Sequence, residues 1–362
     1  MKIPKKVLII ATRRIGDVLL ATPLIRSMRH SWPEAKIDIL VFENSQEIIS
    51  ANPDINHIIT IPENPRLAIQ LGLPIKLLKR YDIAATTQSG DRPVFYAFIG
   101  GRYSVGIIEE TRKEFWKRIV LTEWLQLDDL NIHTVLMNLK LADLLGINRC
   151  YEVVVSWNPR DEEQVIDKIP FDIDSTPFVV LHIYPKFPYK QWHIDGWIGL
   201  ARWFFQQGLR VVFTGGESAD EREYISRCTS QLPHYTVNMA GQMSLREVGF
   251  LLSKARLYVG PDTSVTHIAA STGVPVITLF GPSNPVKWGP WPYQYAHDTN
   301  PYRHKDSQTV KNVTILQGDM ECVPCRKEGC DRHINSLSNC LQNIEPATVI
   351  TAIQNVLDYP FD

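Results

Sequence analysis

Three adjacent side chains stand where the sequence predicts a helix start just beyond a buried strand. Asp262, Thr263 and Ser264 follow the apolar run that ends at Gly260, and a short apolar helix through His267 comes after them. A helix that begins at the end of a parallel strand turns free backbone N–H groups and the positive end of its dipole toward a ligand. We therefore expect this loop to hold a phosphate; the alternative is that one of the three side chains only caps the helix.

A second candidate lies near the N-terminus, in the segment Arg13-Arg14-Ile15-Gly16-Asp17. Gly16 permits a tight turn out of the first strand, and Asp17 then falls in the first turn of the next helix, at the carboxyl edge of the sheet where α/β proteins bind ligands. A carboxylate that faces a ligand there can act as a general base, which accepts a proton. The alternatives are that Asp17 caps its helix and that the two arginines form a solvated turn instead of holding an anionic substrate.

Two lysines occupy a third passage from strand to helix, at Pro185-Lys186-Phe187-Pro188-Tyr189-Lys190. Lys186 and Lys190 would point there at a cleft between two domains, and an ammonium group is a compact point charge that suits a diphosphate. The alternative, which this segment taken alone favours, is an ordinary pair of surface lysines.

Composition limits the class of protein. The chain has 362 residues, 44% of them hydrophobic and 21% charged, with a net charge of −1. These values are typical of a globular protein of two domains without a whole-chain attraction to nucleic acid or lipid. No apolar run reaches the roughly 18 residues of a membrane span. The apolar stretch 7–11 ends at two arginines, so we expect a first strand rather than a signal peptide, and a cytoplasmic protein.

Apolar segments alternate with helical ones through almost the whole chain, which is typical of parallel sheets covered by helices on both faces. Two such sets predict two doubly wound domains, joined within the polar stretch 158–176. Neither half contains G-x-G-x-x-G, which disfavours an ordinary dinucleotide oxidoreductase. The expected strands are 7–11, 37–42, 57–61, 83–87, 178–182, 210–214, 257–260 and 274–280, and the expected helices are 17–31, 46–51, 132–145, 192–207, 217–228, 244–253 and a short one through 267–270.

In their order and spacing, these segments resemble the bacterial ADP-heptose heptosyltransferases of lipopolysaccharide biosynthesis, glycosyltransferase family 9, from Val7 to about Leu357. The motifs that carry the resemblance are Gly16-Asp17 with Thr22-Pro23, Tyr81-Asp82-Ile83, His133, 187–192, 213–216, 240–247, 262–270, and 280–285 followed by 288–291. The resemblance implies an α/β fold of GT-B architecture, in which two Rossmann-like doubly wound domains face an interdomain cleft. The implied parts are an acceptor-binding domain over 1–165, a nucleotide-sugar-binding domain over 166–345, and a C-terminal helix over 346–362, for which a return to the N-terminal domain is one option.

The resemblance also implies roles for individual residues. Asp17 matches the general base that deprotonates the acceptor hydroxyl, and Lys190 matches a lysine that binds the donor diphosphate and steadies the leaving ADP. Where family members often have Pro-Gly-Ala-Ser, this chain has Ile183-Tyr184-Pro185-Lys186, so we expect Lys186 to substitute by charge. The other implied donor-binding residues are Asp262, Thr263, Ser264 and His267 in the nucleotide-sugar loop, Met243 beside the nucleotide, and Asp220 at the ribose.

The implied activity is the inverting transfer of heptose from ADP-heptose onto the inner core of lipopolysaccharide, with Kdo or heptose as acceptor, no metal required for the transfer and no nucleic acid as partner. The alternatives are a protein-modifying heptosyltransferase, as in the modification of autotransporters, and a non-catalytic nucleotide-sugar-binding protein. Because the acceptor is anchored by lipid A, we expect contact with the cytoplasmic face of the inner membrane. The predicted basic and aromatic surface for this contact is Arg102, Arg112, Lys113, Phe115, Trp116, Lys117 and Arg118, with a solvated amphipathic helix as the alternative.

Four cysteines gather near the C-terminus, at Cys322, Cys325, Cys330 and Cys340. A C-x2-C pair followed by two further cysteines is typical of a four-thiolate metal site, and a cytoplasmic chain rarely keeps such cysteines as disulfides. The pattern predicts a structural zinc or iron site without choosing between the two metals. Unliganded thiols are the alternative.

Overall fold

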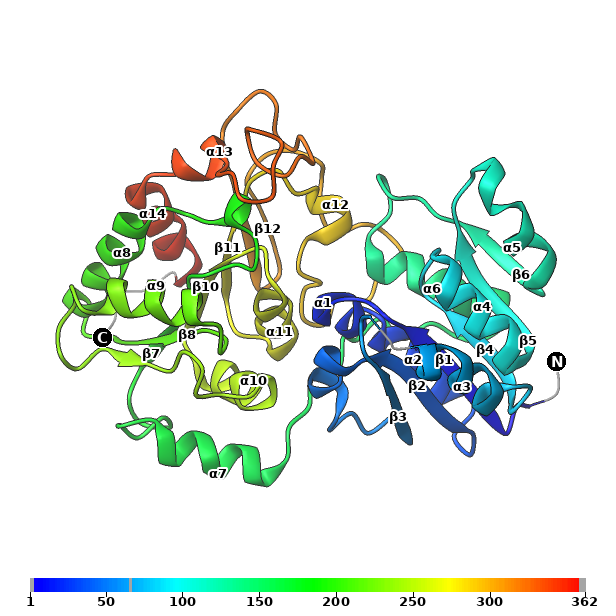
Figure 1. The fold of residues 1–362 in the computed structure, drawn as a ribbon. Helices are drawn as coiled ribbons and strands as arrows, with labels where there is room; N and C mark the ends of the chain where they lie inside the picture. The colour runs from blue at the N-terminus through cyan, green and yellow to red at the C-terminus, as the bar shows by residue number, and fades with distance from the viewer. Residues whose placement is uncertain (1–2, 65–66, 358–362) are drawn as a thin grey trace. The chain divides into compact units, whose positions relative to one another are not determined.

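The computed structural model describes residues 3–64 and 67–357, which form two compact units (Figure 1). The first unit comprises the chain up to Ser156 together with Gln294–Asn300, and the second comprises Trp157–Tyr293 and the chain from Pro301 onward. Each unit is built on its own sheet and has its own apolar core. None of the described helices is long and apolar enough to cross a membrane.

The first unit contains a six-stranded parallel sheet in the order β3-β2-β1-β4-β5-β6. Helices α3, α4 and α5 contact one another in sequence, and α2 contacts α6, as expected when helices cover both faces of a doubly wound sheet. The strands are β1 Lys6–Ala11, β2 Lys36–Phe42, β3 His57–Ile61, β4 Tyr81–Thr86, β5 Gly101–Ile108 and β6 Glu123–Gln126. The helices are α1 Ile15–Leu19, α2 Thr22–Ser31, α3 Leu67–Leu77, α4 Asp91–Gly100, α5 Phe115–Val120 and α6 Thr134–Leu144.

The second unit contains a seven-stranded sheet in the order β12-β13-β11-β10-β7-β8-β9, in which only the edge strand β12 is antiparallel to its neighbour. Its strands are β7 Phe178–His182, β8 Arg210–Thr214, β9 Val237–Asn238, β10 Leu257–Pro261, β11 Val276–Phe280, β12 Gln308–Val310 and β13 Val313–Gln317. Its helices are α7 Pro159–Lys168, α8 Ile194–Gln206, α9 Ala219–Thr229, α10 Leu245–Lys254, α11 Ser264–Thr272, α12 Pro285–Trp288, α13 Asn339–Gln342 and α14 Pro346–Leu357.

Helix α14 packs within the second unit. It contacts α8, β11 and β13, and its side chains Val349 and Ile353 are fully buried in the core of that unit. The described chain therefore ends on the second unit. The return to the N-terminal domain, which the sequence had left as one option, is not seen for the described part of this helix. Residues 358–362 of the expected C-terminal helix lie outside the described residues.

Each sheet has one point at which the strand order changes direction. In the first unit the chain runs outward from β1 through β2 to β3 and then crosses back to β4, so the change lies between β1 and β4. In the second unit the corresponding neighbours are β7 and β10. The loops that follow such a strand pair leave in opposite directions and open a crevice at the carboxyl edge, where ligands bind in α/β proteins.

The helix expected over 17–31 is wrong as a single helix, because the structure contains two. Helix α1 ends at Leu19, and α2 begins at Thr22 with Pro23 in its first turn. A proline has no N–H to bond the carbonyl four residues earlier, and its ring clashes with that carbonyl, so a helix through Leu19 cannot continue across Pro23. The Thr22 hydroxyl donates to the Leu19 carbonyl at 2.7 Å and fixes the corner.

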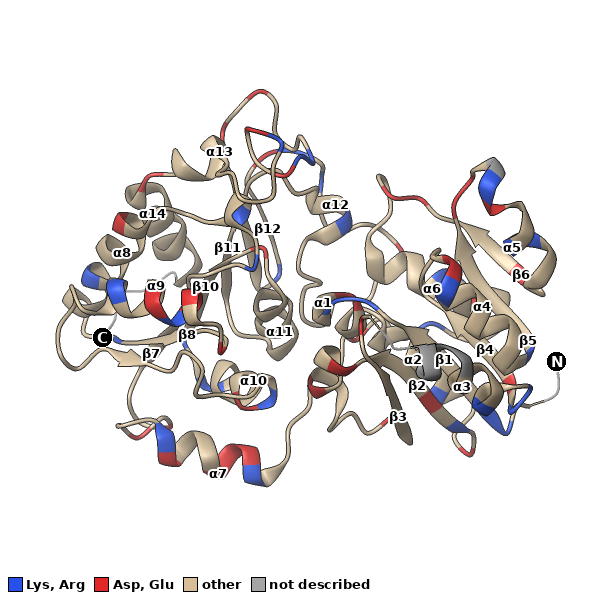
Figure 2. Ribbon diagram, viewed as in Figure 1, with Lys and Arg blue, Asp and Glu red and all other residues tan. Residues whose placement is uncertain are grey.

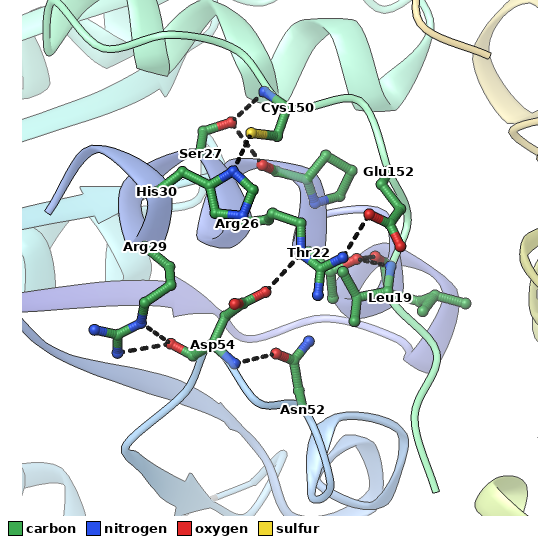
Figure 3. Close-up of polar contacts among 12 residues, drawn as sticks. Leu19, Thr22, Arg26, Ser27, Arg29, His30, Asn52, Asp54, Cys150 and Glu152 are labelled. Atoms are coloured by element: carbon green, nitrogen blue, oxygen red, sulfur yellow. Dashed lines mark hydrogen bonds and ion pairs between the residues drawn. The ribbon is translucent and has the colours of Figure 1, made fainter. Parts of the chain in front are cut away.

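A polar cluster anchors the segment 149–154 to helix α2 (Figure 3). The Val154 N–H donates to Thr22 Oγ1, and the Cys150 N–H donates to Ser27 Oγ at 2.8 Å. Figure 3 also shows Arg26 between Asp54 and Glu152, with Nε 2.8 Å from Asp54 Oδ2 and Nη1 2.5 Å from Glu152 Oε2. The Thr22-Pro23 motif therefore fixes the corner between α1 and α2, and its Thr22 hydroxyl also holds the segment 149–154.

Candidate functional site

The loop after β10 begins the nine-residue helix α11 at the switch point of the second unit. Thr263 is the N-cap residue of α11, but its side chain makes no capping hydrogen bond. Its hydroxyl instead lies 3.3 Å from Thr266 Oγ1, which donates to the Pro261 carbonyl. The alternative that Thr263 serves only to cap the helix is therefore not supported. Because Thr263 and Ser264 are partly exposed, the N-terminus of α11 is open to a ligand.

Lys190 and Asp262 form an ion pair across this switch point. Lys190 ends the 3-10 turn η4 (Pro188–Lys190) that follows β7, and its Nζ lies 2.5 Å from Asp262 Oδ2 and 3.3 Å from the Asp262 carbonyl oxygen. Burial alone would raise the pKa of the Asp262 carboxyl, but the charge of Lys190 and hydrogen bonds from Lys190 and Ser283 hold that pKa below its ordinary value. The pair keeps an ammonium group fixed beside the start of α11.

His267 lies in the first half of α11 and is only 6% exposed. Burial lowers the pKa of His267 to about 4, although the negative charge of Asp262 opposes the effect. The imidazole is therefore neutral at physiological pH. Among the described residues its buried Nδ1 has no hydrogen-bond partner, so this nitrogen is available to a bound ligand or water.

Three carboxylates, those of Glu217, Asp220 and Glu221, follow the Gly215-Gly216 turn at the end of β8, and the structure distinguishes the last two. Asp220 is exposed. Glu221 is half-buried and turns back over the glycines: it accepts a hydrogen bond from the Gly216 N–H, and burial raises its pKa. A Cβ added at Gly216 would lie only 2.9 Å from Glu221 Oε2. Glu221 was not predicted from the sequence, although the spacing Ser218-x-x-Glu221 marks a helix start whose glutamate folds back toward the preceding loop.

The remaining donor-site candidates of the second unit occupy neighbouring strand ends. Met243 is half-buried in the loop between β9 and α10, directly before the capping box formed by Ser244 and Glu247. Lys186 follows β7 but is exposed, with Nζ 6.0 Å from the ring centroid of Phe187. The structure thus brings Lys190, Asp262 and His267 together, with Thr263 and Ser264 next to them in the chain, and leaves Lys186 and Asp220 facing solvent.

In the first unit, α1 carries Asp17 at the switch point between β1 and β4. The N-cap residue of α1 is Arg14, so Asp17 is a first-turn residue and not the cap itself. The Asp17 side chain is 17% exposed, and its Oδ1 lies 3.4 Å from Nη1 of Arg13. A partly exposed carboxylate with a cation beside it therefore lies at the carboxyl edge of this sheet, where α/β proteins bind ligands.

Gln88 follows β4, the other strand of the same switch point, and was not predicted from the sequence as a site residue. Its Oε1 accepts a hydrogen bond from Thr12 Oγ1, at the end of β1, over 3.1 Å. The residue is 7% exposed, and its Nε2 has no hydrogen-bond partner among the described residues. A buried amide nitrogen without a partner can donate to a ligand oxygen at this edge. A polar residue two positions beyond a buried strand was the signal that could have identified it.

The four clustered cysteines do not form a metal ligand set in this structure. All four are free: Cys322 and Cys330 are exposed, Cys325 is half-buried and Cys340 is buried. Within the residues that the structure describes, no group of three or more His, Cys, Asp and Glu side chains is placed to hold a metal ion. Burial, together with the nearby thiols of Cys325 and Cys330, raises the pKa of Cys340 to about 12. The four-thiolate site stays a prediction from the sequence.

Known proteins are similar to this chain in sequence and in fold. Residues 94–331 match the family described as glycosyltransferase family 9 (heptosyltransferase). Over 328 residues the chain is 27% identical to lipopolysaccharide heptosyltransferase 3 of Escherichia coli K12, covering 84% of this chain and 92% of that protein. Among solved structures, the glycosyl transferase family 9 protein of Veillonella parvula has a TM-score of 0.79 at 20% identity, covering 99% of this chain and 98% of that one.

A second solved structure, the E. coli heptosyltransferase WaaC with ADP-2-deoxy-2-fluoro heptose, has a TM-score of 0.70 at 19% identity, covering 97% of this chain and 99% of that one. These likenesses confirm the expected fold class, an α/β protein of GT-B type with two Rossmann-like units. Because the family match spans more than half of its length, the chain belongs to glycosyltransferase family 9, the heptosyltransferase family.

Proposed function

We propose that the chain is an inverting glycosyltransferase that moves heptose from ADP-heptose onto the inner core of lipopolysaccharide. The observation that carries the proposal is the Lys190–Asp262 pair beside the start of α11, at the switch point of the second unit. When the bond between heptose and diphosphate breaks, negative charge develops on the leaving ADP, and a fixed ammonium with oriented backbone N–H groups stabilises such charge. The names of similar proteins, a lipopolysaccharide heptosyltransferase and a heptosyltransferase with an ADP-heptose analogue, support the choice of substrates.

The donor would lie along the strand ends of the second unit. In this proposal its diphosphate binds Lys190 and the N-terminal N–H groups of α11 at Thr263 and Ser264. Asp262 acts as a positioning residue, because its buried carboxylate holds the Lys190 ammonium in place. The neutral His267 presents its free nitrogen to the donor without adding charge.

The nucleoside would extend across the ends of β8 and β9. We assign the ribose hydroxyls to Glu221 rather than to Asp220, because Glu221 turns toward the Gly215-Gly216 turn while Asp220 is exposed. Met243 would pack against the base, since a half-buried thioether offers an apolar surface at the next strand end. Lys186, which is exposed, would contribute charge at a distance rather than a direct contact.

The acceptor would bind the first unit, with Asp17 as general base. The acceptor hydroxyl oxygen attacks the anomeric carbon of heptose, the bond from that carbon to the diphosphate oxygen breaks, and the hydroxyl proton passes to Asp17. A single displacement of this kind inverts the anomeric centre. Arg13, which pairs with Asp17, and the amide group of Gln88, which follows the neighbouring strand β4, would hold an anionic acceptor sugar. The transfer proposed here requires no metal ion.

The proposed acceptor is Kdo or heptose attached to lipid A, so we also propose that the protein works in the cytoplasm at the inner face of the inner membrane. An acceptor anchored in lipid requires the enzyme to reach the membrane surface, and none of the described helices spans a membrane. Peripheral contact would meet that requirement.

Kinetics of two single variants test the proposal. Asp17→Asn should leave the affinity for ADP-heptose nearly unchanged and lower kcat by roughly 100-fold or more, on the order of 3 kcal/mol, because only proton transfer is lost. Lys190→Ala should weaken donor binding and lower kcat together, because the lysine contacts the diphosphate before and during bond breaking. ADP release with a lipid A–Kdo acceptor measures turnover, and calorimetric titration measures donor affinity.

Three outcomes would contradict the proposal. Full turnover in Asp17→Asn with a loss of about 1 kcal/mol of stability would make Asp17 a helix-stabilising residue only. Donor binding without transfer to any saccharide acceptor would indicate a nucleotide-sugar-binding protein, and transfer to protein acceptors alone would indicate a protein-modifying enzyme. For the ribose assignment, Glu221→Gln should weaken ADP binding while the neighbouring, exposed Asp220→Asn should not; the reverse result would restore Asp220.

A further inference from the structure

Exposed apolar side chains concentrate on one layer of helices in the first unit. Fourteen large hydrophobic side chains are exposed in the described chain, and six of them lie on α3, α4 and α5 or directly after α3. Helix α3 contacts α4 and α4 contacts α5, so the three helices are neighbours in one layer. The six side chains, with their exposed fractions, are Ile75 (76%), Leu78 (60%), Phe95 (42%), Phe98 (37%), Phe115 (65%) and Ile119 (68%).

Helix α5 shows the unusual polarity of this layer most clearly. Phe115 and Ile119, one turn apart, face solvent, whereas Lys117 between them is only 2% exposed. A surface helix ordinarily does the reverse, with its apolar stripe toward the core and its charges toward water. On α4 the pair Phe95 and Phe98 is likewise exposed at a spacing of three residues, while the intervening Ala97 is buried. The exposed apolar groups are therefore additional to those that the core uses.

The same layer has an excess of positive charge at its surface. Its two acidic residues, Asp91 and Glu114, both pair with the buried Lys117, whose Nζ also donates to the Ser89 carbonyl at 2.5 Å. Although burial would lower the pKa of Lys117, these carboxylates hold it above its ordinary value. Figure 2 shows the Lys and Arg residues of α5. The basic side chains at the surface of the layer are Lys76, Lys79, Arg80, Arg92, Lys113 and Arg118.

Lys117 does not belong to the surface that was expected to meet the membrane. The expectation was wrong for Lys117, because its charge is buried and used within the unit. The side chain of Arg112 lies outside the described residues. The predicted surface also omitted α3, the residue after it and α4, which together carry four of the six exposed apolar side chains.

We propose that the α3–α4–α5 face, defined by these six apolar and six basic side chains, docks on an anionic lipid bilayer. Aromatic and aliphatic groups that project outward can enter the region between headgroups and acyl chains, and lysines and arginines around them attract anionic headgroups. A second copy of the chain is a poorer occupant, because a two-fold interface would place like charges of the two faces opposite each other. The inference rests on the proposed function only for where the acceptor lies, because the surface is defined by its own side chains.

The test uses the full chain and sedimentation with extruded vesicles. We expect binding to vesicles of phosphatidylethanolamine with phosphatidylglycerol, weaker binding to phosphatidylcholine vesicles, and a decrease as salt is raised. Two double variants, Phe115→Ser with Ile119→Ser and Lys76→Glu with Lys113→Glu, should each lower the vesicle affinity by about tenfold. All four positions are exposed, so the fold should persist, which a thermal melt would verify.

Matched controls come from exposed residues of the second unit. Ile166→Ser with Leu337→Ser removes two apolar groups that are 53% and 44% exposed, and Lys305→Glu with Lys327→Glu reverses two exposed charges. Neither pair should change vesicle binding. Equal losses in face and control variants, or no binding by the parent protein, would overturn the proposal. A dimer in light scattering that Phe115→Ser with Ile119→Ser abolishes would also overturn it, in favour of a second copy on this face.

A soluble acceptor separates this inference from the proposed activity. Transfer to an acceptor without acyl chains should proceed equally in the parent protein and in both face variants, because their substitutions lie outside the sites of Asp17 and Lys190. Lost transfer in the parent protein would contradict the proposed function but leave the vesicle result intact. Lost transfer in the face variants alone would mean that the face binds the acceptor sugar, which would overturn the bilayer as its occupant.

Discussion

At the scale of single residues, two lysines show how the same charge serves different purposes. Lys117 is 2% exposed and meets two carboxylates and a carbonyl oxygen, so its hydrogen-bonding capacity is used within the unit. Lys190 is 21% exposed, and within the described part of the chain its ammonium group bonds only to Asp262, through its carboxylate and its carbonyl. An ammonium group has three donors, so Lys190 keeps capacity for a ligand that Lys117 lacks. Exposure and donor count, rather than the residue type, separate a structural from a binding lysine.

The Arg26 cluster in Figure 3 should contribute strongly to stability. Arg26 is 16% exposed and its partner Asp54 is 9% exposed, so Arg26→Ala would leave a buried carboxylate without its cation. We expect a loss of about 2–3 kcal/mol in the free energy of unfolding. Urea denaturation followed by fluorescence measures it. As a control, Glu152→Ala removes the other partner, which is 61% exposed, and should cost less than about 1 kcal/mol. Equal losses would contradict the argument from burial.

Two buried histidines should make the protein less stable in mild acid. Burial lowers the pKa of both His182 and His267 to about 4, against about 6.5 in the unfolded chain. Between these values the unfolded state binds a proton that the folded state refuses, so stability falls as the pH drops from 6.5 toward 4. At pH 5 each histidine would cost on the order of 1–2 kcal/mol.

Thermal melts at pH 7.5 and pH 5 test this dependence. We expect His182→Gln, which lies outside the proposed site, to lose a smaller part of its Tm between the two pH values than the parent protein does. The exposed His304→Gln should behave like the parent protein. An unchanged pH dependence in His182→Gln would show that the acid sensitivity comes from other groups.

The positions of single residues in the fold were predicted best where a sequence motif fixed them and less well where the phase of a helix decided them. Lys190, which follows β7, lies together with Asp262 and His267, which follow β10, and the resemblance had implied that all three bind the donor. Asp220 and Glu221 differ by one position, which is a rotation of about 100° around a helix, and the sequence pattern did not resolve which of them faces the glycine turn. The direction of Lys117 was wrongly predicted for the same reason. On the short helix α5, the sequence pattern did not show that Lys117 points inward while Phe115 and Ile119 point to solvent.

At the scale of elements, the buried strands were the most predictable features. The strands expected at 7–11, 37–42, 57–61, 178–182 and 210–214 each match an observed strand to within about one residue, because parallel strands covered on both faces are continuous apolar runs. The segment 91–108 was missed, because the apolar helix α4 passes directly into β5 at Gly100-Gly101 without a polar break. The helix expected at 46–51 is only the 3-10 turn η2 (Glu47–Ile49).

The cysteine-bearing segment 322–340 gives a prediction at this scale. Cys322 and Cys330 are exposed and should react rapidly with a thiol reagent in the native protein. Cys340 and Cys228 are buried, burial raises the pKa of each to about 12, and both should react only after unfolding. Titration with Ellman's reagent, with and without denaturant, measures the two classes. Protection of all four clustered cysteines, with one equivalent of zinc or iron in the purified protein, would instead support the four-thiolate site that the sequence predicts.

At the scale of the whole molecule, the two units repeat one solution to ligand binding. Each sheet reverses its strand order once, and the strongest candidate residue of each unit, Asp17 or Lys190, lies in the segment that follows a strand of that reversal. The sequence predicted two doubly wound domains from the alternation of elements, but strand order is set by long-range packing that local patterns do not encode. The positions of the two switch points could therefore not be predicted from the sequence.

Separate cores also predict that the donor stabilises only one unit. The core of the second unit draws on β7, β8, β10, β11, α8 and α14, and that of the first draws on β1, β4, α4 and their neighbours. A ligand that binds only the folded second unit raises the stability of that unit by RT ln(1 + [L]/Kd), about 2.7 kcal/mol at 100 times Kd.

In hydrogen exchange with ADP, the slowest amides of β7 and β10 should therefore slow by roughly 100-fold, while those of β1 and β4 should not change. Lys190→Ala should shrink the effect at the same ADP concentration, because fewer molecules are bound. Equal slowing in both sheets would mean that the two units unfold as one, and slowing confined to β1 and β4 would move the donor site to the first unit.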